Sequence, residues 1–296
     1  MTTPPSVPTL DFTGERFTPE CVREIWYEHW ARYAFALDLA RGKRVLDAAC
    51  GEGFGSAALA RVAHQVTGLD ISAQAIAHAQ ARYGNVANLR YVQGDCTRLE
   101  LPPASFDLAI SIETLEHVAA QEDMVAGFAR VLADDGVFIV SSPDKRTYSD
   151  ITGFHNEFHV RELYREELLA LLKTHFPEVR LFGQKLLFQS AIWSLDEGPS
   201  AAAVAAATTE QAADGSTLIK SGLRYDPLYF IAVCSRRPLH DLPRLALFGD
   251  SEESVYQHYN HEVRKNITAG GRIVELETQV EELRAEVERL RGGAAP

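Results

Sequence analysis

The chain has 296 residues, and 46% of them are hydrophobic, so it can bury a sizeable core in one large domain or two small ones. Its formal net charge of −12 argues against a nucleic-acid backbone as the main partner, because phosphate binding requires a basic face. Four scattered cysteines without paired metal-ligand spacing suit a reducing cytoplasm: Cys21, Cys50, Cys96 and Cys234. The N-terminus lacks a signal-peptide pattern and no apolar run approaches the roughly 18 residues of a membrane span, so we expect a cytoplasmic protein.

Four segments are predicted along the chain. Residues 1–13 are polar and proline-rich and are predicted to be disordered, residues 14–238 form the main domain, residues 239–271 form a linker or helical extension, and residues 272–292 form a short coiled coil. The main domain opens with a helical pattern from about Glu20 to Arg41 that carries many aromatic side chains. We interpret these aromatics as a packing face. In the alternative, Arg16 and nearby aromatics close over a ligand.

Strands then alternate with helices. Strands are predicted at Val45–Ala49, Gln65–Asp70, Leu89–Gln93, Phe106–Ile112, Gly136–Ser141, Val179–Gln189 and Pro227–Cys234. Helices are predicted at Ser56–Ala63, Ala73–Tyr83 and Arg165–His175, and a further helix follows the segment Glu113–Val118 and ends at Leu132. This alternation is typical of right-handed βαβ units. We therefore expect an α/β fold, a Rossmann-like and mostly parallel sheet of seven strands with helices on both faces. An alanine-rich stretch, about 196–225, is predicted to be a mobile insertion.

The C-terminal segment has a heptad pattern. Apolar residues follow a 3-4-3-4-3 spacing at Ile273, Leu276, Val280, Leu283, Val287 and Leu290. β-Branched residues at a and leucine at d favour a parallel two-stranded coil, and therefore a homodimer. The alternative is a single amphipathic helix packed on the protein body.

A glycine-rich turn follows the first predicted strand, with alternate glycines at Gly51, Gly53 and Gly55. Glycines let the backbone turn sharply and approach a ligand closely. The next helix begins directly afterwards, so its free N–H groups point at that ligand. Dinucleotide-binding folds usually show G-x-G-x-x-G, whereas the spacing here is G-x-G-x-G with Asp47 four residues before the first glycine.

The pattern from Asp47 to Gly55 resembles motif I of the class I S-adenosylmethionine-dependent methyltransferases. This resemblance implies S-adenosylmethionine as the cofactor, with its amino-acid end at the glycine turn. Asp70 ends the second strand and is placed for the ribose hydroxyls. Asp95 resembles the family's adenine-contacting acidic position. The complete predicted cofactor set is Arg16, Asp47, Cys50, Gly51, Gly53, Asp70, Ile71, Asp95, Cys96 and Ile112.

A second motif follows the fourth strand. The run Glu113-Thr114-Leu115-Glu116-His117 resembles motif IV of small-molecule and sugar O-methyltransferases, including the ubiquinone-biosynthesis type. Methyl transfer is an in-line displacement, and a sugar hydroxyl becomes a good nucleophile as its proton is removed. We predict His117 as the general base, with Glu116 and Glu113 orienting it or binding substrate; the alternative is a histidine that caps or packs the following helix.

A narrower resemblance lies outside this core, at Gly14–Phe17, Glu28–Tyr33, Ser142–Lys145 and His155–Leu163. These blocks are similar to methyltransferases of bacterial surface-polysaccharide synthesis, which implies a sugar or glycan acceptor. We predict that His155, Asn156 and His159 contact the substrate, while a divalent-metal site that combines the two histidines with carboxylates stays open. A different class also stays open: a cofactor-binding scaffold whose coil recruits a glycosyltransferase. Other acceptors, a small phenol or an amino sugar, are compatible with the same motifs.

Overall fold

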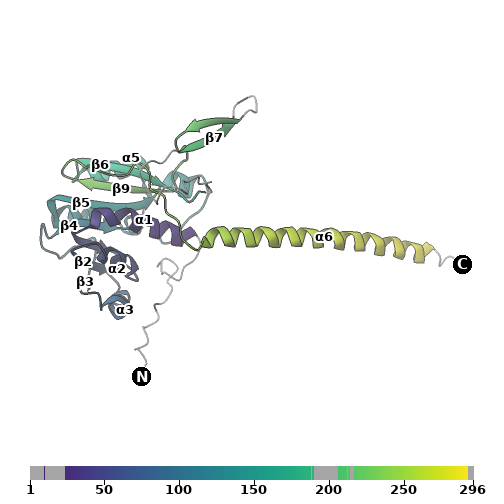
Figure 1. The fold of residues 1–296 in the computed structure, drawn as a ribbon, viewed down its shortest axis with the longest axis horizontal. Helices are drawn as coiled ribbons and strands as arrows, with labels where there is room; N and C mark the ends of the chain where they lie inside the picture. Colours follow the sequence, from purple (N-terminus) through teal and green to yellow (C-terminus); the bar gives the residue numbers. More distant parts are fainter. Residues whose placement is uncertain are drawn as a thin grey trace, which may run out of the picture. The chain divides into compact units, whose positions relative to one another are not determined.

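Figure 1 shows a computed structural model of the chain, in which residues 10, 24–187, 189, 206–211, 213 and 217–292 are described. Contacts divide the chain into two units, Met1–Phe248 and Gly249–Pro296. Arg16 lies outside the described residues, as does the predicted disordered segment 1–13 apart from residue 10. Among the described residues, no helix combines the length and apolar character needed to cross a bilayer.

The first unit is built on a seven-stranded sheet with the order β3-β2-β1-β4-β5-β9-β6. Its strands are β1 (Arg44–Ala48), β2 (Gln65–Asp70), β3 (Leu89–Gln93), β4 (Phe106–Ser111), β5 (Leu132–Pro143), β6 (Glu178–Gln184) and β9 (Tyr229–Ser235). β1 to β5 are parallel, whereas β9 runs antiparallel to both of its neighbours, β5 and β6. The predicted mostly parallel Rossmann-like sheet is confirmed. The strand order reverses between β1 and β4, and ligands of open α/β sheets bind at the carboxyl ends of strands beside such a point.

Two apolar cores cover the two faces of this sheet. One joins α1 (Glu24–Ala40), α2 (Phe54–Ala60) and α3 (Ala73–Tyr83) to strand residues such as Val45; the other joins α4 (Gln121–Val131) and α5 (Arg165–Lys173) to residues such as Leu46. Successive strand side chains point to opposite faces, so the continuous apolar runs of the sequence fill both cores.

The aromatic residues of α1 form a packing face, as predicted. The Trp30 and Tyr33 rings lie 5.0 and 5.2 Å from the Phe54 ring at the start of α2, and Tyr33 is buried. The Phe35 ring lies 5.1 Å from that of Phe182 on β6. These contacts fix α1 over the carboxyl-end region of the sheet.

Several boundaries differ from the sequence expectation. β5 begins at Leu132, directly after α4, and β6 ends at Gln184 rather than at residue 189. Short turns of helix, η1 (Leu115–His117) and η2 (Arg146–Asp150), occupy the segments after β4 and β5. Within the predicted insertion the described residues form an antiparallel hairpin, β7 (Ala207–Gln211) and β8 (Thr217–Ser221). Most of the alanine run lies outside the described residues.

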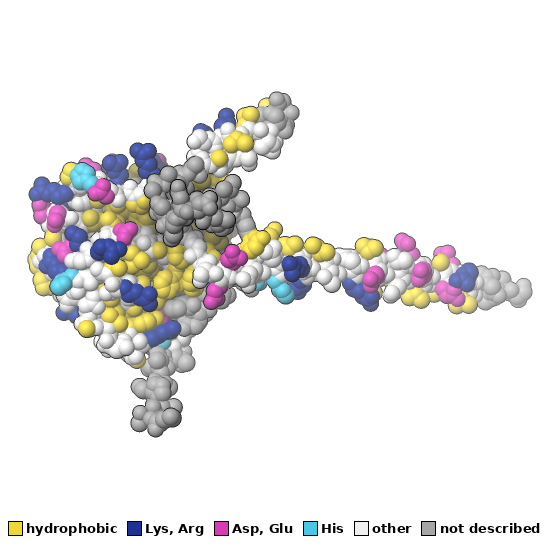
Figure 2. Space-filling model, viewed as in Figure 1, with side chains coloured by type: hydrophobic (Ala, Val, Ile, Leu, Met, Phe, Trp, Pro, Cys, Tyr) yellow, Lys and Arg dark blue, Asp and Glu magenta, His cyan; other side chains and the backbone are white. Residues whose placement is uncertain are grey.

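The second unit contains one long helix, α6 (Ser254–Gly292). The helix passes without a break through the predicted boundary between linker and coil. The six heptad residues are between 43% and 66% exposed. Figure 2 shows apolar and charged side chains interleaved along this helix.

Candidate functional site

The glycine turn after β1 requires glycine for steric reasons. Gly51 and Gly53 have positive φ angles of 55° and 94°, which L side chains rarely adopt. A Cβ on Gly53 would stand 2.7 Å from the Cβ of Ala79 and 2.8 Å from the hydroxyl of Tyr91. The Tyr91 hydroxyl also donates to the Gly53 carbonyl at 2.7 Å. The turn is therefore held close against α3 and β3.

Asp47 supports this turn from inside the protein. Its side chain is fully buried and accepts from the Ser56 hydroxyl at 2.6 Å and from the Tyr33 hydroxyl at 3.1 Å. Burial raises the pKa of this carboxyl to about 6. The predicted cofactor role of Asp47 thus becomes an indirect one in this geometry, because the carboxylate ties β1 to α2 and α1 and does not reach the surface of the turn.

Asp70 connects the second strand to the same turn. Its Oδ2 accepts from the backbone N–H of Gly51 at 2.9 Å, and its Oδ1 accepts from that of Ser72 at 2.8 Å. The cap of α3 is supplied by Ser72, whose hydroxyl accepts from Ala75 N at 3.2 Å. Asp70 is therefore not needed as the cap, and each of its oxygens keeps a lone pair for a ribose hydroxyl.

The predicted adenine side contains one polar anchor and several apolar walls. Asp95 Oδ1 accepts from the backbone N–H and the hydroxyl of Thr97, at 2.8 and 2.7 Å. Ile71 is 67% exposed, as expected for a side chain that a bound ring would cover, whereas Ile112 is buried. Cys96 is buried too, in the apolar core on the α4 and α5 face of the sheet, and burial raises the pKa of its thiol to about 12.

Cys50, which directly precedes the glycine turn, is a second buried cysteine. Its side chain is 3% exposed, and burial raises the pKa of its thiol well above the ordinary value. Its backbone N–H donates to the Leu69 carbonyl at 2.9 Å. Cys50 thus fixes the start of the glycine turn to β2.

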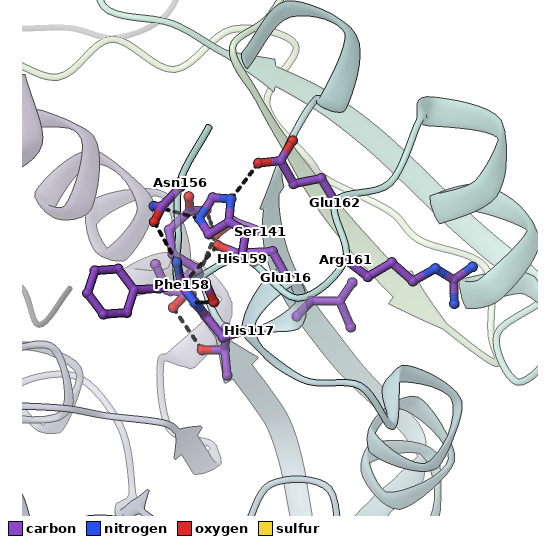
Figure 3. A network of polar contacts seen from close by, with 12 residues as sticks. Glu116, His117, Ser141, Asn156, Phe158, His159, Arg161 and Glu162 are labelled. Atoms are coloured by element: carbon purple, nitrogen blue, oxygen red, sulfur yellow. Dashed lines mark hydrogen bonds and ion pairs between the residues drawn. The ribbon is translucent and has the colours of Figure 1, made fainter. Parts of the chain in front are cut away.

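His117 stands after β4, across the strand-order reversal from the glycine turn. Its Nδ1 lies 3.0 Å from the carbonyl oxygen of Phe158 (Figure 3). A carbonyl only accepts, so the His117 Nδ1 carries a proton and donates to it. Glu116, which is 1% exposed, places its Oε1 3.7 Å from that Nε2. An imidazole with a proton on Nδ1 and a carboxylate beside Nε2 suits a general base, because the carboxylate stabilises the charge that protonation of Nε2 creates.

The neighbouring histidine is held by two other side chains. His159 Nδ1 lies 2.5 Å from Glu162 Oε1, and its Nε2 lies 3.0 Å from the amide nitrogen of Asn156. Asn156 Oδ1 accepts from Phe158 N at 3.0 Å, which orients that amide so that its nitrogen donates to His159. The His117 and His159 rings meet edge to face at 4.9 Å (Figure 3).

The three residues predicted to contact the substrate, His155, Asn156 and His159, lie on one segment after η2. The segment that carries them is irregular, so the shared face that a helix would give His155 and His159 is absent from these described residues. His155 is exposed, whereas the His159 side chain is 7% exposed with both nitrogens engaged. In this geometry His159 and Asn156 shape the wall beside His117.

The Glu113 carboxylate contacts residues other than the His117 imidazole. It accepts from the Ser141 hydroxyl at 2.5 Å and lies 3.6 Å from the Arg32 guanidinium. The backbone of Glu113 has a positive φ of 46°. The sequence patterns assign no role to Arg32, Ser56 or Glu162. The partner of Arg32, Gln184, lies 152 residues later in the chain, whereas Ser56 pairs with Asp47 and Glu162 with His159, which are close in the sequence.

A metal-ligand geometry also exists at this site. One ligand atom each from Glu116, His117 and His159 all lie within 4.8 Å of one another. Two imidazoles and a carboxylate suit a divalent transition metal, and each imidazole turns its Nδ1 to a fixed acceptor, as metal-bound histidines usually do. The residues therefore fit a cation as well as a base, and a ligand bond at His117 Nε2 would occupy the lone pair that a base requires.

Comparisons with known proteins agree with the arrangement of the cofactor side. Residues 46–140 match the family model described as a methyltransferase domain. A protein of Mycolicibacterium smegmatis named "Probable S-adenosylmethionine-dependent methyltransferase" is 39% identical over 173 residues, 57% of this chain and 66% of that protein. A protein of Mycobacterium tuberculosis with the same description is 37% identical over 189 residues, 61% of this chain and 68% of that protein. The chain thus spans about two thirds of the length of these two relatives.

Two further matches are weaker, one because it covers less of the chain and the other because its sequence identity is lower. A fatty-acid O-methyltransferase of Mycolicibacterium smegmatis is 36% identical over 112 residues, 37% of this chain and 40% of that enzyme. The crystal structure of the YcgJ protein of Bacillus subtilis aligns with a TM-score of 0.50 at 21% identity, covering 71% of this chain and all of the other. The structural match supports the fold alone.

Proposed function

Because this chain belongs to the S-adenosylmethionine-dependent methyltransferases, we propose that it transfers the methyl group to a hydroxyl of a sugar or an oligo- or polysaccharide. S-Adenosylmethionine, when bound, supplies an electrophilic methyl carbon on a sulfonium sulfur. The observation that supports O-methylation is the placement of His117 just after β4, with its Nδ1 3.0 Å from the Phe158 carbonyl oxygen and its Nε2 3.7 Å from Glu116 Oε1. Hydroxyl oxygens need such a base, since they are weak nucleophiles while they keep their proton.

The residues of the chain act at three neighbouring strand ends. Gly51, Gly53 and Asp70 hold the cofactor at the ends of β1 and β2, and His117 holds the acceptor oxygen at the end of β4. Transfer of the methyl carbon to that oxygen would break its bond to the sulfonium sulfur, with S-adenosylhomocysteine as the leaving group. His117 Nε2 takes the hydroxyl proton, and Glu116 stabilises the resulting imidazolium. β1 pairs with both β2 and β4 in the sheet, so the acceptor and the methyl donor are brought together without a large movement.

The sugar assignment rests on the polar wall around His117 and on the sequence blocks that resemble surface-polysaccharide methyltransferases. A second candidate acceptor is a hydroxyl or carboxyl group on an apolar molecule. It is favoured by four large apolar side chains on the segment beside His117, Ile151, Phe154, Phe158 and Val160, which are between 43% and 64% exposed. A relative named as a fatty-acid O-methyltransferase agrees with this candidate.

A methyl-transfer screen distinguishes these acceptors. The chain is incubated with S-adenosylmethionine and a panel of mono- and oligosaccharides, amino sugars, phenols and fatty acids, and product linkage is determined. We expect methylation of a sugar hydroxyl, and none with an Asp70→Asn chain as the matched control. Methylation of a fatty acid or phenol while the sugars stay unmodified would replace the sugar acceptor by the second candidate. Calorimetry that detects no S-adenosylmethionine binding would leave only the scaffold hypothesis.

The heptads of α6 are proposed to make a parallel homodimer. Six exposed apolar residues at a and d positions give a seam, and in a parallel pair Arg272 would face Glu277 of the second copy. In the structure Arg272 bonds instead to Glu275 of its own helix at 2.8 Å, a surface pair that contributes little and can exchange. The same coil would be the contact for a glycosyltransferase partner if the chain also acts as a scaffold.

Removal of residues 271–296 is therefore expected to halve the mass of the particle in light scattering, because the dimer seam is lost. Leu283→Asp should do the same, since it places a charge at a buried d position of the coil. Ala285→Asp puts the same charge on the outer face of the helix and serves as the matched control, with no change of mass. An unchanged mass for the truncated chain would mean that the heptads do not set assembly.

A further inference from the structure

Arg32 on α1 is among the largest fully buried side chains of the described residues, with 1% of its side chain exposed. A guanidinium buried this deeply must be paired, because removing its charge from water is costly. Its Nε donates to Gln184 Oε1 at 2.7 Å, and its carbon lies 4.5 Å from the centroid of the Tyr229 ring. Its Nη2 lies 3.6 Å from Glu113 Oε1, at the end of β4. Arg32 thus spans from α1 across the carboxyl-end region of the sheet.

Glu113 is the residue at which the chain leaves β4 and turns toward His117. Its backbone has a left-handed conformation, and two hydrogen bonds with the Ser141 hydroxyl hold it. Glu113 N donates to Ser141 Oγ at 2.9 Å, and Ser141 Oγ donates to Glu113 Oε1 at 2.5 Å. A non-glycine residue keeps such a conformation only where its surroundings hold it. The turn Leu115–His117 follows after a single residue.

The charges around Glu113 explain why Arg32 is needed. Glu28 lies one helical turn before Arg32 and is 8% exposed; burial raises its pKa to about 7, Arg32 opposes that rise, and Glu113 adds to it. Without the guanidinium, two carboxylates would repel each other with no cation between them. Arg32 therefore supplies the positive charge beside the Glu113 carboxylate, which also accepts from Ser141.

We propose that Arg32 and Glu113 form a strut that holds the turn carrying His117, which makes both of them positioning residues for methyl transfer. The proposal rests on the proposed function for its catalytic consequence, because His117 is the base there. It gives α1 a role beyond packing, because the Arg32 side chain of this helix then fixes where the His117 imidazole stands.

The test uses the full chain with Arg32→Met, which keeps the volume but removes the charge, and Glu113→Gln, which keeps the shape. Hydrogen exchange is followed in peptides that cover residues 112–118, together with kcat and the dissociation constant of S-adenosylmethionine. We expect faster exchange confined to that turn, a kcat about tenfold lower, and cofactor affinity within about twofold of the unchanged chain. The double variant should be no worse than either single one, because both remove the same contact. Arg41→Met, at an exposed position just after α1, is the matched control.

Each outcome decides a different point. Unchanged exchange at residues 112–118 in a folded variant would overturn the strut, and so would additive losses in the double variant. Faster local exchange with unchanged kcat would support the strut and contradict the base role of His117. If Arg32→Met does not fold, Glu113→Gln provides the same readouts, since its side chain is 16% exposed and less dependent on burial.

Discussion

His117→Ala is expected to lower kcat by about 10²- to 10³-fold while leaving the affinity for S-adenosylmethionine within about twofold. The physical reason is the loss of the group that accepts the hydroxyl proton as the oxygen–methyl bond forms. His117 lies at the end of β4, whereas the predicted cofactor anchors lie at the ends of β1 and β2, so that binding and turnover should separate. Single-turnover kinetics and calorimetry measure the two quantities.

His64→Ala is the control for this experiment, because His64 is exposed before β2. Turnover of the His117 variant within about twofold of the unchanged chain would remove the base role. Treatment with a chelator gives a second check. If the cluster of Glu116, His117 and His159 acts by holding a cation, chelation should abolish turnover and added divalent metal should restore it, whereas a base should be insensitive to both.

Asp70→Asn is expected to weaken S-adenosylmethionine binding by about 100-fold. Two backbone N–H groups, from Gly51 and Ser72, donate to the two carboxylate oxygens of Asp70. An amide can accept at only one of these positions and would point its own donor at the other, and it would also lose one acceptor for the ribose hydroxyls. Two charge-assisted hydrogen bonds of about 1.5 kcal/mol each account for an effect of this size.

Calorimetry checks this prediction, with Asp38→Asn as the control, since the Asp38 side chain is 93% exposed and lies far along α1 from the glycine turn. An affinity within about threefold of the unchanged chain would show that the carboxylate contributes neither to the turn nor to the cofactor. Asp47→Asn provides a useful contrast. It should lower the stability or the rigidity of the turn without removing a contact to the cofactor, because Asp47 faces Ser56 and Tyr33.

Several strands and helices of the sheet domain could be predicted from the sequence, because each is specified by apolar periodicity among neighbouring residues. The predicted bounds of β2, α3 and β3 agree with the structure, since each is a short apolar or amphipathic run between turn residues. The bounds of β5 and β6 were harder to predict from the sequence. The start of β5 pairs with Phe106 of β4, and its last residues, like those of β6, pair with Tyr229 and Phe230 of β9. The hairpin of β7 and β8 has no apolar alternation that would have distinguished it from an insertion without strands.

The sequence by itself determined the glycine turn, Asp70 after β2 and His117 after β4, because strand ends meet in a parallel sheet and place these residues at one edge. Only the tertiary structure decided what each side chain does there. It directs Asp47 inward and Glu113 toward Arg32, and it gives His117 a backbone carbonyl from Phe158, 41 residues later, that accepts from its Nδ1. Spacing along the chain fixes which strand end carries a residue, whereas the direction of a carboxylate or an imidazole depends on partners that only packing brings within hydrogen-bond distance.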